Sequence, residues 1–152
     1  MSAPAHNLHA STVAFGPTAG VLILGPSGAG KSRLAMALIG LGAQLVADDQ
    51  TLLASLDDAL YARAPRAIAG LLEVRGVGLI RLLPRRLAQV ALVVDLGAPA
   101  PPRLPEPQRR VIAGIALPCL AGPPGGPSPD AVKHYIQMSC LKGQLAGFPG
   151  QS

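Results

Sequence analysis

The segment Gly25–Ser32 combines residue types and a spacing that suit phosphate binding. It reads Gly-Pro-Ser-Gly-Ala-Gly-Lys-Ser and fits the P-loop pattern G-x-x-x-x-G-K-[ST] behind a short aliphatic run. Glycines let backbone N–H groups close around a phosphate, Lys31 would reach the β- and γ-phosphates, and the Ser32 hydroxyl would be a ligand of Mg²⁺. A glycine-rich turn that binds nothing is the alternative. We expect a nucleoside triphosphate to contact Gly25, Pro26, Ser27, Gly28, Ala29, Gly30, Lys31 and Ser32.

Two adjacent carboxylates, Asp48 and Asp49, end the expected strand Gly42–Gln50. Transfer of a phosphoryl group to a hydroxyl needs a carboxylate that orients the hydroxyl and takes its proton, and it needs ligands for the metal. Adjacent side chains on an extended backbone point in opposite senses, so one carboxylate would face the metal and the other the acceptor. A solvated strand end or a helix cap is the alternative at this point.

Three further sites contain residues that could take part in the chemistry. Strand alternation puts Glu73 and Arg75 on one face, where they present an acid and a base side by side, or only an exposed ion pair. Taken alone, His9 would be interpreted as a surface histidine and Arg103 as a solvated arginine.

The elements that would position these residues alternate between strands and helices, which predicts an α/β fold with a mixed sheet and flanking helices. The expected helices are Ser32–Gly40 and Asp130–Leu145, the second with Asp130 as its N-cap. The expected strands and loops are an edge strand in the later part of Leu8–Phe15, strands at Gly20–Leu24, Gly42–Gln50, Leu87–Leu96 and Val111–Leu117, a hairpin strand or turn in Thr51–Tyr61, and a proline-rich loop at Ala98–Pro107.

Length and composition limit the remaining possibilities. The 152 residues fit one domain over residues 1–145, with a disordered tail over 146–152. Aromatic residues make up 3% of the chain, which argues against a base-stacking platform for single-stranded nucleic acid, and the net charge of +5 comes from scattered arginines. No signal peptide or membrane-spanning stretch is visible, and Cys119 and Cys140 lack metal or redox spacing. We therefore expect a cytoplasmic protein that binds neither nucleic acid nor membrane.

Four segments together resemble the catalytic domain of the bacterial HPr kinase/phosphorylase family, whose members phosphorylate a serine of the phosphocarrier protein HPr. The segments are Gly25–Ser32, Leu45–Asp49, Leu72–Ile80 and Arg103–Leu104. The stretch Leu72–Ile80, Leu-Glu-Val-Arg-Gly-Val-Gly-Leu-Ile, matches the family's signature and is more specific than a P-loop. The resemblance covers about residues 9–118 and implies the P-loop kinase fold shared with phosphoenolpyruvate carboxykinase, with ATP and Mg²⁺ as cofactors.

The resemblance also implies a role for each matching residue. Asp49 would take the serine proton, Lys31 would bind phosphate, and Ser32, Glu73 and Asp48 would hold Mg²⁺. His9 and Arg103 would be the accessory active-site residues, and Arg75 would belong to a segment used in both directions of phosphoryl transfer. The implied partner is HPr or a paralogous phosphocarrier, and the implied assembly is a homo-oligomer, a hexamer in the family.

The chain departs from the family in three places. The N-terminal domain of the long members is absent, which indicates a short form. The segment Cys119–Gly126 lacks the Arg and Asn of a Pro-x-x-x-Gly-Arg-Asn loop linked to dephosphorylation, which argues against phosphorylase activity. Pro102–Pro105 replaces Asp-Arg-Leu-Gly. Two other functions stay open, a small-molecule kinase and a regulator that binds nucleotide without catalysis.

Overall fold

Strand β3 (Gly20–Leu24) is the central element from which the P-loop leaves the sheet. The computed structural model describes residues 6–97, 108–122 and 126–146, without the side chains of 140–146. Strand β3 pairs in parallel with β9 (Ala88–Asp95) and antiparallel with β2 (Ala10–Ala14). Its central residues Val21, Leu22 and Ile23 have no exposed surface, as expected for a strand covered on both faces.

The large sheet is mixed and curled, and β9 joins its two halves. Along its main path the strand order is β1-β5-β6-β9-β3-β2-β4. Strand β9 pairs with β6 through Ala88 and Gln89 and with β11 through residues 93–95. The curl brings the start of β5 against β2, and there the hydroxyls of Thr12 and Thr51 lie 3.0 Å apart. The other strands are β1 (His6–Leu8), β4 (Gln44–Ala47), β5 (Thr51–Leu56), β6 (Ala59–Arg63), β10 (Gln108–Ile112) and β11 (Ile115–Ala121).

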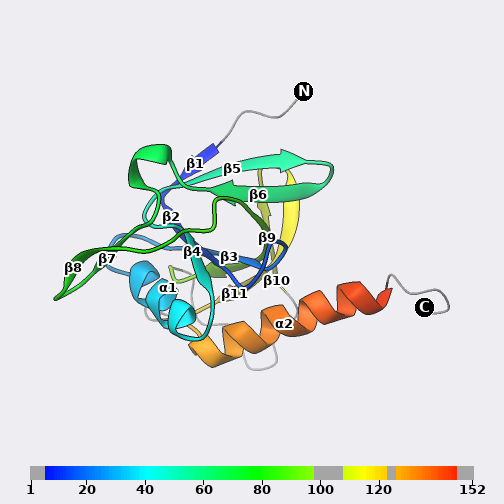
Figure 1. The fold of residues 1–152 in the computed structure, drawn as a ribbon. Coiled ribbons are helices and arrows are strands. Elements are labelled where there is room, and N and C mark those ends of the chain that lie inside the picture. The colour runs from blue at the N-terminus through cyan, green and yellow to red at the C-terminus, as the bar shows by residue number, and fades with distance from the viewer. Residues whose placement is uncertain (1–5, 98–107, 123–125, 147–152) are drawn as a thin grey trace.

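Both helices lie on one side of this sheet (Figure 1). Helix α1 (Lys31–Gly40) begins directly after the P-loop, and α2 (Pro129–Ala146) packs beside it, with Lys133 Nζ donating to the carbonyl of Leu41 at 2.9 Å. The helices cover an aliphatic cluster that we call the helix-side core. It includes Val13, Val21, Ile23, Leu34, Leu38, Leu92, Val94, Val132 and Ile136.

The opposite face of the sheet holds a second aliphatic cluster, which we call the inner core. Alternation along the strands sends Leu22 and Val93 to this face and their neighbours to the helix-side core. The curled halves of the sheet enclose the inner core between them. Its other members include Ala10, Val46, Leu53, Leu60, Ala62, Ile112 and Leu117.

A separate two-stranded hairpin, β7 (Leu71–Val74) and β8 (Gly78–Arg81), follows the short 3-10 helix η1 (Arg66–Ile68). Figure 1 shows this hairpin projecting beside α1. Leu72 is fully buried in the helix-side core, so the hairpin is anchored close to the P-loop helix.

Most of the elements expected from sequence are present, and the fold class is confirmed. The P-loop strand, helix α1, strand β9 and the hairpin β5–β6 form where the sequence predicts them. Two expectations fall outside the described residues: the loop over 98–107, and the tail over 146–152, apart from Ala146, which ends α2.

Four local expectations were wrong. Strand β2 is an interior strand between β3 and β4, and the main path of the sheet ends at β1 and at β4. Residues 111–117 do not form one strand, because Ala113 and Gly114 adopt positive φ and make a turn between the end of β10 and the start of β11. Arg75 lies in the turn between β7 and β8, so it does not share a strand face with Glu73. Helix α2 starts at Pro129, which puts Asp130 in the first turn.

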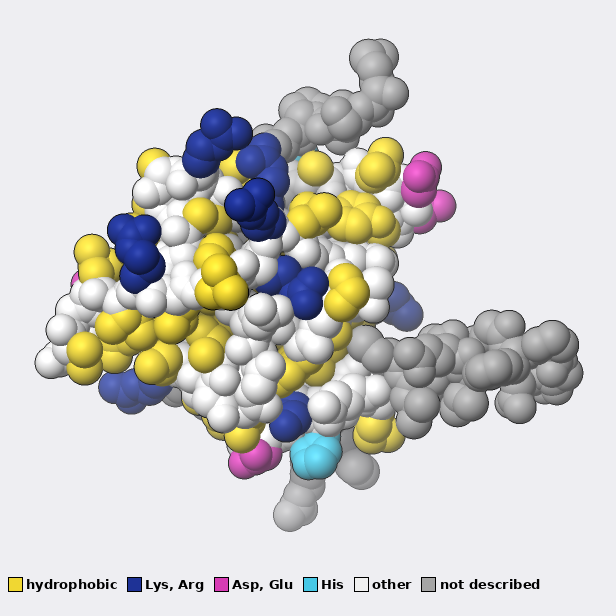
Figure 2. All heavy atoms as spheres, in the orientation of Figure 1, with side chains coloured by type: hydrophobic (Ala, Val, Ile, Leu, Met, Phe, Trp, Pro, Cys, Tyr) yellow, Lys and Arg dark blue, Asp and Glu magenta, His cyan; other side chains and the backbone are white. Residues whose placement is uncertain are grey.

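Figure 2 shows Lys and Arg side chains at several separate points on one face, with acidic side chains at its margins. The positive charge of this face is therefore distributed over the surface.

A substitution at Gly20 tests the close pairing of β3 with β9. A Cβ atom at Gly20 would lie 2.7 Å from the carbonyl oxygen of Gln89, and that backbone belongs to the central pair of strands. Gly20→Ala should lower the free energy of unfolding by about 1–3 kcal/mol, measured by urea denaturation. Gly16→Ala is the control, because a Cβ atom there meets nothing within 4 Å. Equal stability of the two variants would contradict this packing.

Candidate active site

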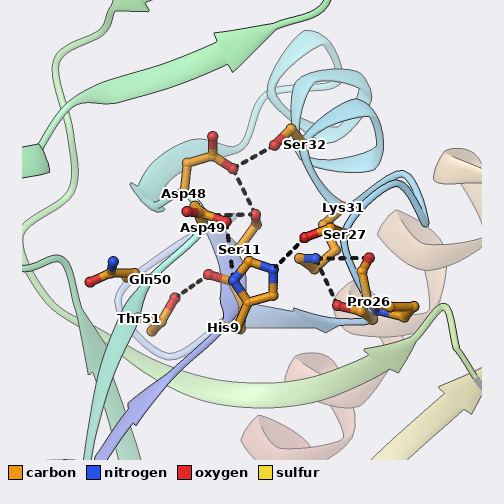
Figure 3. A network of polar contacts seen from close by, with 12 residues as sticks. His9, Ser11, Pro26, Ser27, Lys31, Ser32, Asp48, Asp49, Gln50 and Thr51 are labelled. Carbon is orange, nitrogen blue, oxygen red and sulfur yellow. Dashed lines mark hydrogen bonds and ion pairs between the residues drawn. The ribbon is translucent and has the colours of Figure 1, made fainter.

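The Asp48 carboxylate is the centre of a polar network at the end of β4 (Figure 3). It is 7% exposed and accepts hydrogen bonds from three groups on different elements. Its Oδ1 accepts from Ser11 Oγ at 2.7 Å and from Ser32 Oγ at 2.8 Å, and its Oδ2 accepts from the Glu73 N–H at 3.2 Å. A buried carboxylate is costly unless donors satisfy it, and these donors come from β2, α1 and β7. The carboxylate thus joins the P-loop helix to two strands.

Asp49 points away from this network because the backbone turns sharply there. Its φ is +70°, and the Gln50 N–H donates to the carbonyl of Asp48 at 2.8 Å, which closes a three-residue turn. The expectation of an extended backbone at the pair was therefore wrong, but the two carboxylates still diverge. The Ala10 N–H donates to the carbonyl of Asp49, and the Thr51 hydroxyl donates to the carbonyl of Ala10, so both bonds fix the turn against β2.

His9 lies between Asp49 and the P-loop (Figure 3). Its Nδ1 is 3.2 Å from Asp49 Oδ1, and its Nε2 is 3.4 Å from Ser27 Oγ. The side chains of His9 and Asp49 are 47% and 63% exposed, so both are accessible to an incoming molecule. The structure thus brings His9 into contact with a carboxylate and with the phosphate-binding loop.

The P-loop holds Lys31 in a defined position. Lys31 is buried, and its Nζ donates to the carbonyls of Gly25 at 2.7 Å and Pro26 at 3.1 Å. An ammonium group has three donors, so one is left for a phosphate oxygen. Gly30 precedes α1 with a φ of +101°, which a side chain would disfavour. The start of α1 then presents backbone N–H groups to an anion.

The other predicted residues differ in where they lie. Glu73 reaches the network through its backbone N–H, while its side chain is exposed. Arg75 is exposed in the hairpin turn, and no hydrogen bond or ion pair of its side chain is found among the described residues. Arg103 lies outside the described residues.

The donors near Ser32 suit Mg²⁺, which prefers carboxylate and hydroxyl oxygens and takes further ligands from phosphates and water. Ser32 Oγ and Asp48 Oδ1 are 2.8 Å apart at the start of α1. Within residues 6–97, 108–122 and 126–146, no group of three or more His, Cys, Asp or Glu side chains could hold a metal by itself.

Sequence reasoning missed Ser11. Its hydroxyl donates to Asp48 and accepts from the Asp49 N–H at 3.3 Å, so it connects both carboxylates. The available signal was the polar pair Ser11-Thr12 inside a strand that is otherwise apolar. Ser11 and Thr12 are fully buried, and a buried hydroxyl needs partners.

Sequence reasoning also missed Asp95 and Arg110, which form an ion pair at the end of β9. Their residue types gave no motif, and strand pairing brings them together across 15 residues of sequence.

This fold, with a P-loop between a central strand and its helix in a curled mixed sheet, is that of the P-loop kinases. Comparison with known proteins gives the particular family. The family model described as HPr Serine kinase C-terminal domain matches residues 2–85, and the chain belongs to this family.

Relatives with curated descriptions agree with this assignment. The HPr kinase/phosphorylase of Clostridium beijerinckii is 48% identical over 61 residues, which cover 40% of this chain and 20% of that protein. That of Geobacillus kaustophilus is 44% identical over 85 residues, which cover 51% of this chain and 27% of that protein. The matches thus span only about a fifth to a quarter of the length of these relatives.

A solved structure is similar over nearly the whole chain. The Hpr(Ser) kinase/phosphatase from Coxiella burnetii has a TM-score of 0.75 and 27% identity, with 91% of this chain and 93% of that chain covered. The fold therefore extends the likeness beyond residue 85, where the family model ends. Of the helices described here, neither is long and apolar enough to cross a membrane.

Ser11→Ala tests whether this hydroxyl organises the carboxylates. The change removes a donor to Asp48 and an acceptor for the Asp49 N–H, so we expect the free energy of unfolding to fall by about 1–3 kcal/mol. We also expect severalfold weaker binding of Mg·ATP, measured by calorimetry. Ser55→Ala on β5 is the control, because no hydrogen bond of its side chain is found among the described residues. Unchanged stability and affinity in Ser11→Ala would show that the network does not depend on Ser11.

Proposed function

We propose that this chain is an ATP-dependent kinase that phosphorylates a serine of HPr or of a paralogous phosphocarrier protein. One observation carries the proposal: adjacent carboxylates are divided between two tasks. Asp48 accepts a hydrogen bond from Ser32 of the P-loop, whereas Asp49 pairs with His9. Membership of the HPr serine kinase C-terminal domain family supports a phosphorylated protein as the product.

The nucleotide side of the proposed site consists of the P-loop, Lys31, Ser32 and Asp48. Backbone N–H groups of the loop and the free donor of Lys31 would bind the phosphate oxygens. Ser32 would hold Mg²⁺ through its hydroxyl oxygen, with Asp48 orienting that hydroxyl and Glu73 adding a carboxylate nearby. Mg²⁺, when bound, neutralises charge on the β- and γ-phosphates.

The acceptor side consists of Asp49 and His9. The serine Oγ would form a bond to the γ-phosphorus while the bond from that phosphorus to the bridging oxygen breaks and leaves its electron pair on ADP. Asp49 would take the serine proton, and His9 would orient Asp49 through the contact of 3.2 Å. Arg103 and Arg75 keep the accessory roles that the family resemblance implies for them.

Three further properties belong to the same proposal. A homo-oligomeric and in particular hexameric state rests on the family resemblance. A cytoplasmic location and the absence of nucleic acid and membrane partners rest on the composition and sequence patterns described above. The reverse reaction is not part of the proposal, because Cys119–Gly126 lacks the Arg and Asn of the dephosphorylation loop.

Asp49→Asn should abolish phosphoryl transfer while Mg·ATP binding stays within about twofold of the original. An amide retains the size of the side chain and tolerates a positive φ, but it cannot accept the serine proton. Asp58→Asn is the matched control, because Asp58 also has a positive φ, +63°, in the turn between β5 and β6. Transfer that persists in Asp49→Asn would rule out Asp49 as the base.

Incubation with γ-labelled ATP, Mg²⁺ and purified HPr tests the function itself. We expect acid-stable label on a serine of HPr, located by peptide mapping, and no loss of that label on later addition of inorganic phosphate. Label on small metabolites instead of HPr would replace the proposal with a small-molecule kinase. Tight ATP binding without any transfer would replace it with a nucleotide-dependent regulator.

A further inference from the structure

A pocket of about 370 Å³ opens beside His9. It is lined by His6, His9 and Arg110, and by aliphatic residues that include Leu8, Leu24 and Ile112. Leu8, Leu24 and Ile112 all belong to or pack against the inner core. The pocket is therefore the open end of the inner core, at the edge of the sheet from which the P-loop leaves β3.

The pocket and the P-loop helix lie on opposite faces of the sheet. Helix α1 covers the helix-side core, whereas the pocket continues the inner core. His9 connects the two sides, because it lines the pocket and contacts both Asp49 and Ser27. Phosphoryl transfer places the attacking and the leaving oxygen roughly in line. An acceptor in this pocket would reach Asp49 from the side opposite to the nucleotide.

Arg110 contributes a guanidinium group to the lining of this pocket. Its side chain is 42% exposed, and its Nη2 donates to Oδ2 of Asp95, which is 13% exposed. A guanidinium group has five N–H donors in a planar fork, so this pairing leaves donors for a second anion. Burial raises the pKa of the nearby Cys119 thiol more than Arg110 lowers it, so the thiol is neutral at pH 7 and adds no competing charge.

We propose that this pocket is the acceptor subsite, and that Arg110 binds an anionic side chain of the acceptor protein beside the target serine and thereby positions that serine before transfer. The aliphatic walls would take an apolar side chain beside that serine. The inference rests on the proposed kinase function and names an acceptor-binding residue for it. The family resemblance points to Arg103 and not to Arg110 as its accessory arginine.

A purely structural role for Arg110 makes a different prediction. Asp95 Oδ1 accepts from the Gly97 N–H at 2.9 Å, and the Leu96 N–H donates to the carbonyl of Leu24 at 2.8 Å. A Cβ atom on Gly97 would lie 3.1 Å from Pro26, so this turn supports the base of the P-loop. If Arg110 acted only by holding Asp95 in this turn, the loss of either partner would have the same effect on nucleotide binding.

Steady-state kinetics with HPr as the varied substrate separate the two roles. We expect Arg110→Ala to raise KM for HPr roughly tenfold or more, the loss of a charge-assisted hydrogen bond, while KM for ATP stays within about twofold. Arg110→Lys keeps the charge but loses the planar fork of donors, so its KM for HPr should lie between that of the original chain and that of Arg110→Ala. Asp95→Asn keeps an acceptor for Gly97 and releases the Arg110 charge, so KM for HPr should stay the same or fall. Arg109→Ala is the control, an exposed neighbour on β10.

Two kinetic results would overturn the proposal. One is an unchanged KM for HPr in Arg110→Ala. The other is a rise of KM for HPr and KM for ATP that is equal in Arg110→Ala and Asp95→Asn. That result would indicate that Arg110 has only a structural role.

A binding measurement distinguishes failure of this inference from failure of the proposed function. Titration with a short peptide that carries an acidic side chain beside a serine, while saturating Mg·ADP occupies the P-loop, should shift the NMR signals of the Arg110 side chain and the His9 ring. The shifts should be lost in Arg110→Ala and kept in Arg109→Ala. Binding of this kind without label on HPr would refute HPr as the acceptor, while the pocket would still be supported as the acceptor subsite. Label on HPr without such binding would refute the pocket as the acceptor subsite, while the proposed kinase function would still be supported.

Discussion

The buried carboxylate of Asp48 is the interaction on which the arrangement of the site depends. A carboxylate that is 7% exposed must be satisfied by donors, and here they come from Ser11, Ser32 and the Glu73 backbone. These partners belong to β2, α1 and β7, so one charge requirement fixes the start of the P-loop helix, an interior strand and the separate hairpin relative to each other. Asp49 is the next residue, and its orientation follows from the turn that the network anchors.

The curled sheet gives the two proposed subsites different surfaces of the same molecule. Strand β3 delivers the P-loop at the edge where β9 also ends, and the register pairs Leu24 with Asp95. One face of this edge carries α1 with the proposed phosphate site, and the other opens into the pocket beside His9. His9 and Asp49 lie where the two faces meet. The geometry thus gives the proposed nucleotide site and the proposed acceptor subsite different faces of the same sheet.

Features set by local sequence pattern could be predicted from the sequence, whereas features set by contacts between distant strands could not. The P-loop, its strand and helix, and the nearness of Asp48 to Ser32 follow from local pattern and from strand order. The turn at Asp49 was missed because hydrogen bonds from Gln50 and across to Ala10 stabilise its positive φ, and these form only in the folded sheet. Ser11, Asp95 and Arg110 were missed because strand pairing, which residue spacing does not encode, brings them to the site. His9 needed the family resemblance.

The structure of this chain with Mg²⁺ and the non-hydrolysable analogue AMP-PNP tests the division of tasks between Asp48 and Asp49 most directly. The account predicts a metal coordinated by Ser32 Oγ with Asp48 against it, and a γ-phosphate whose nearest free carboxylate is Asp49. A metal held by Asp95, or a γ-phosphate turned away from Asp49 and His9, would contradict it.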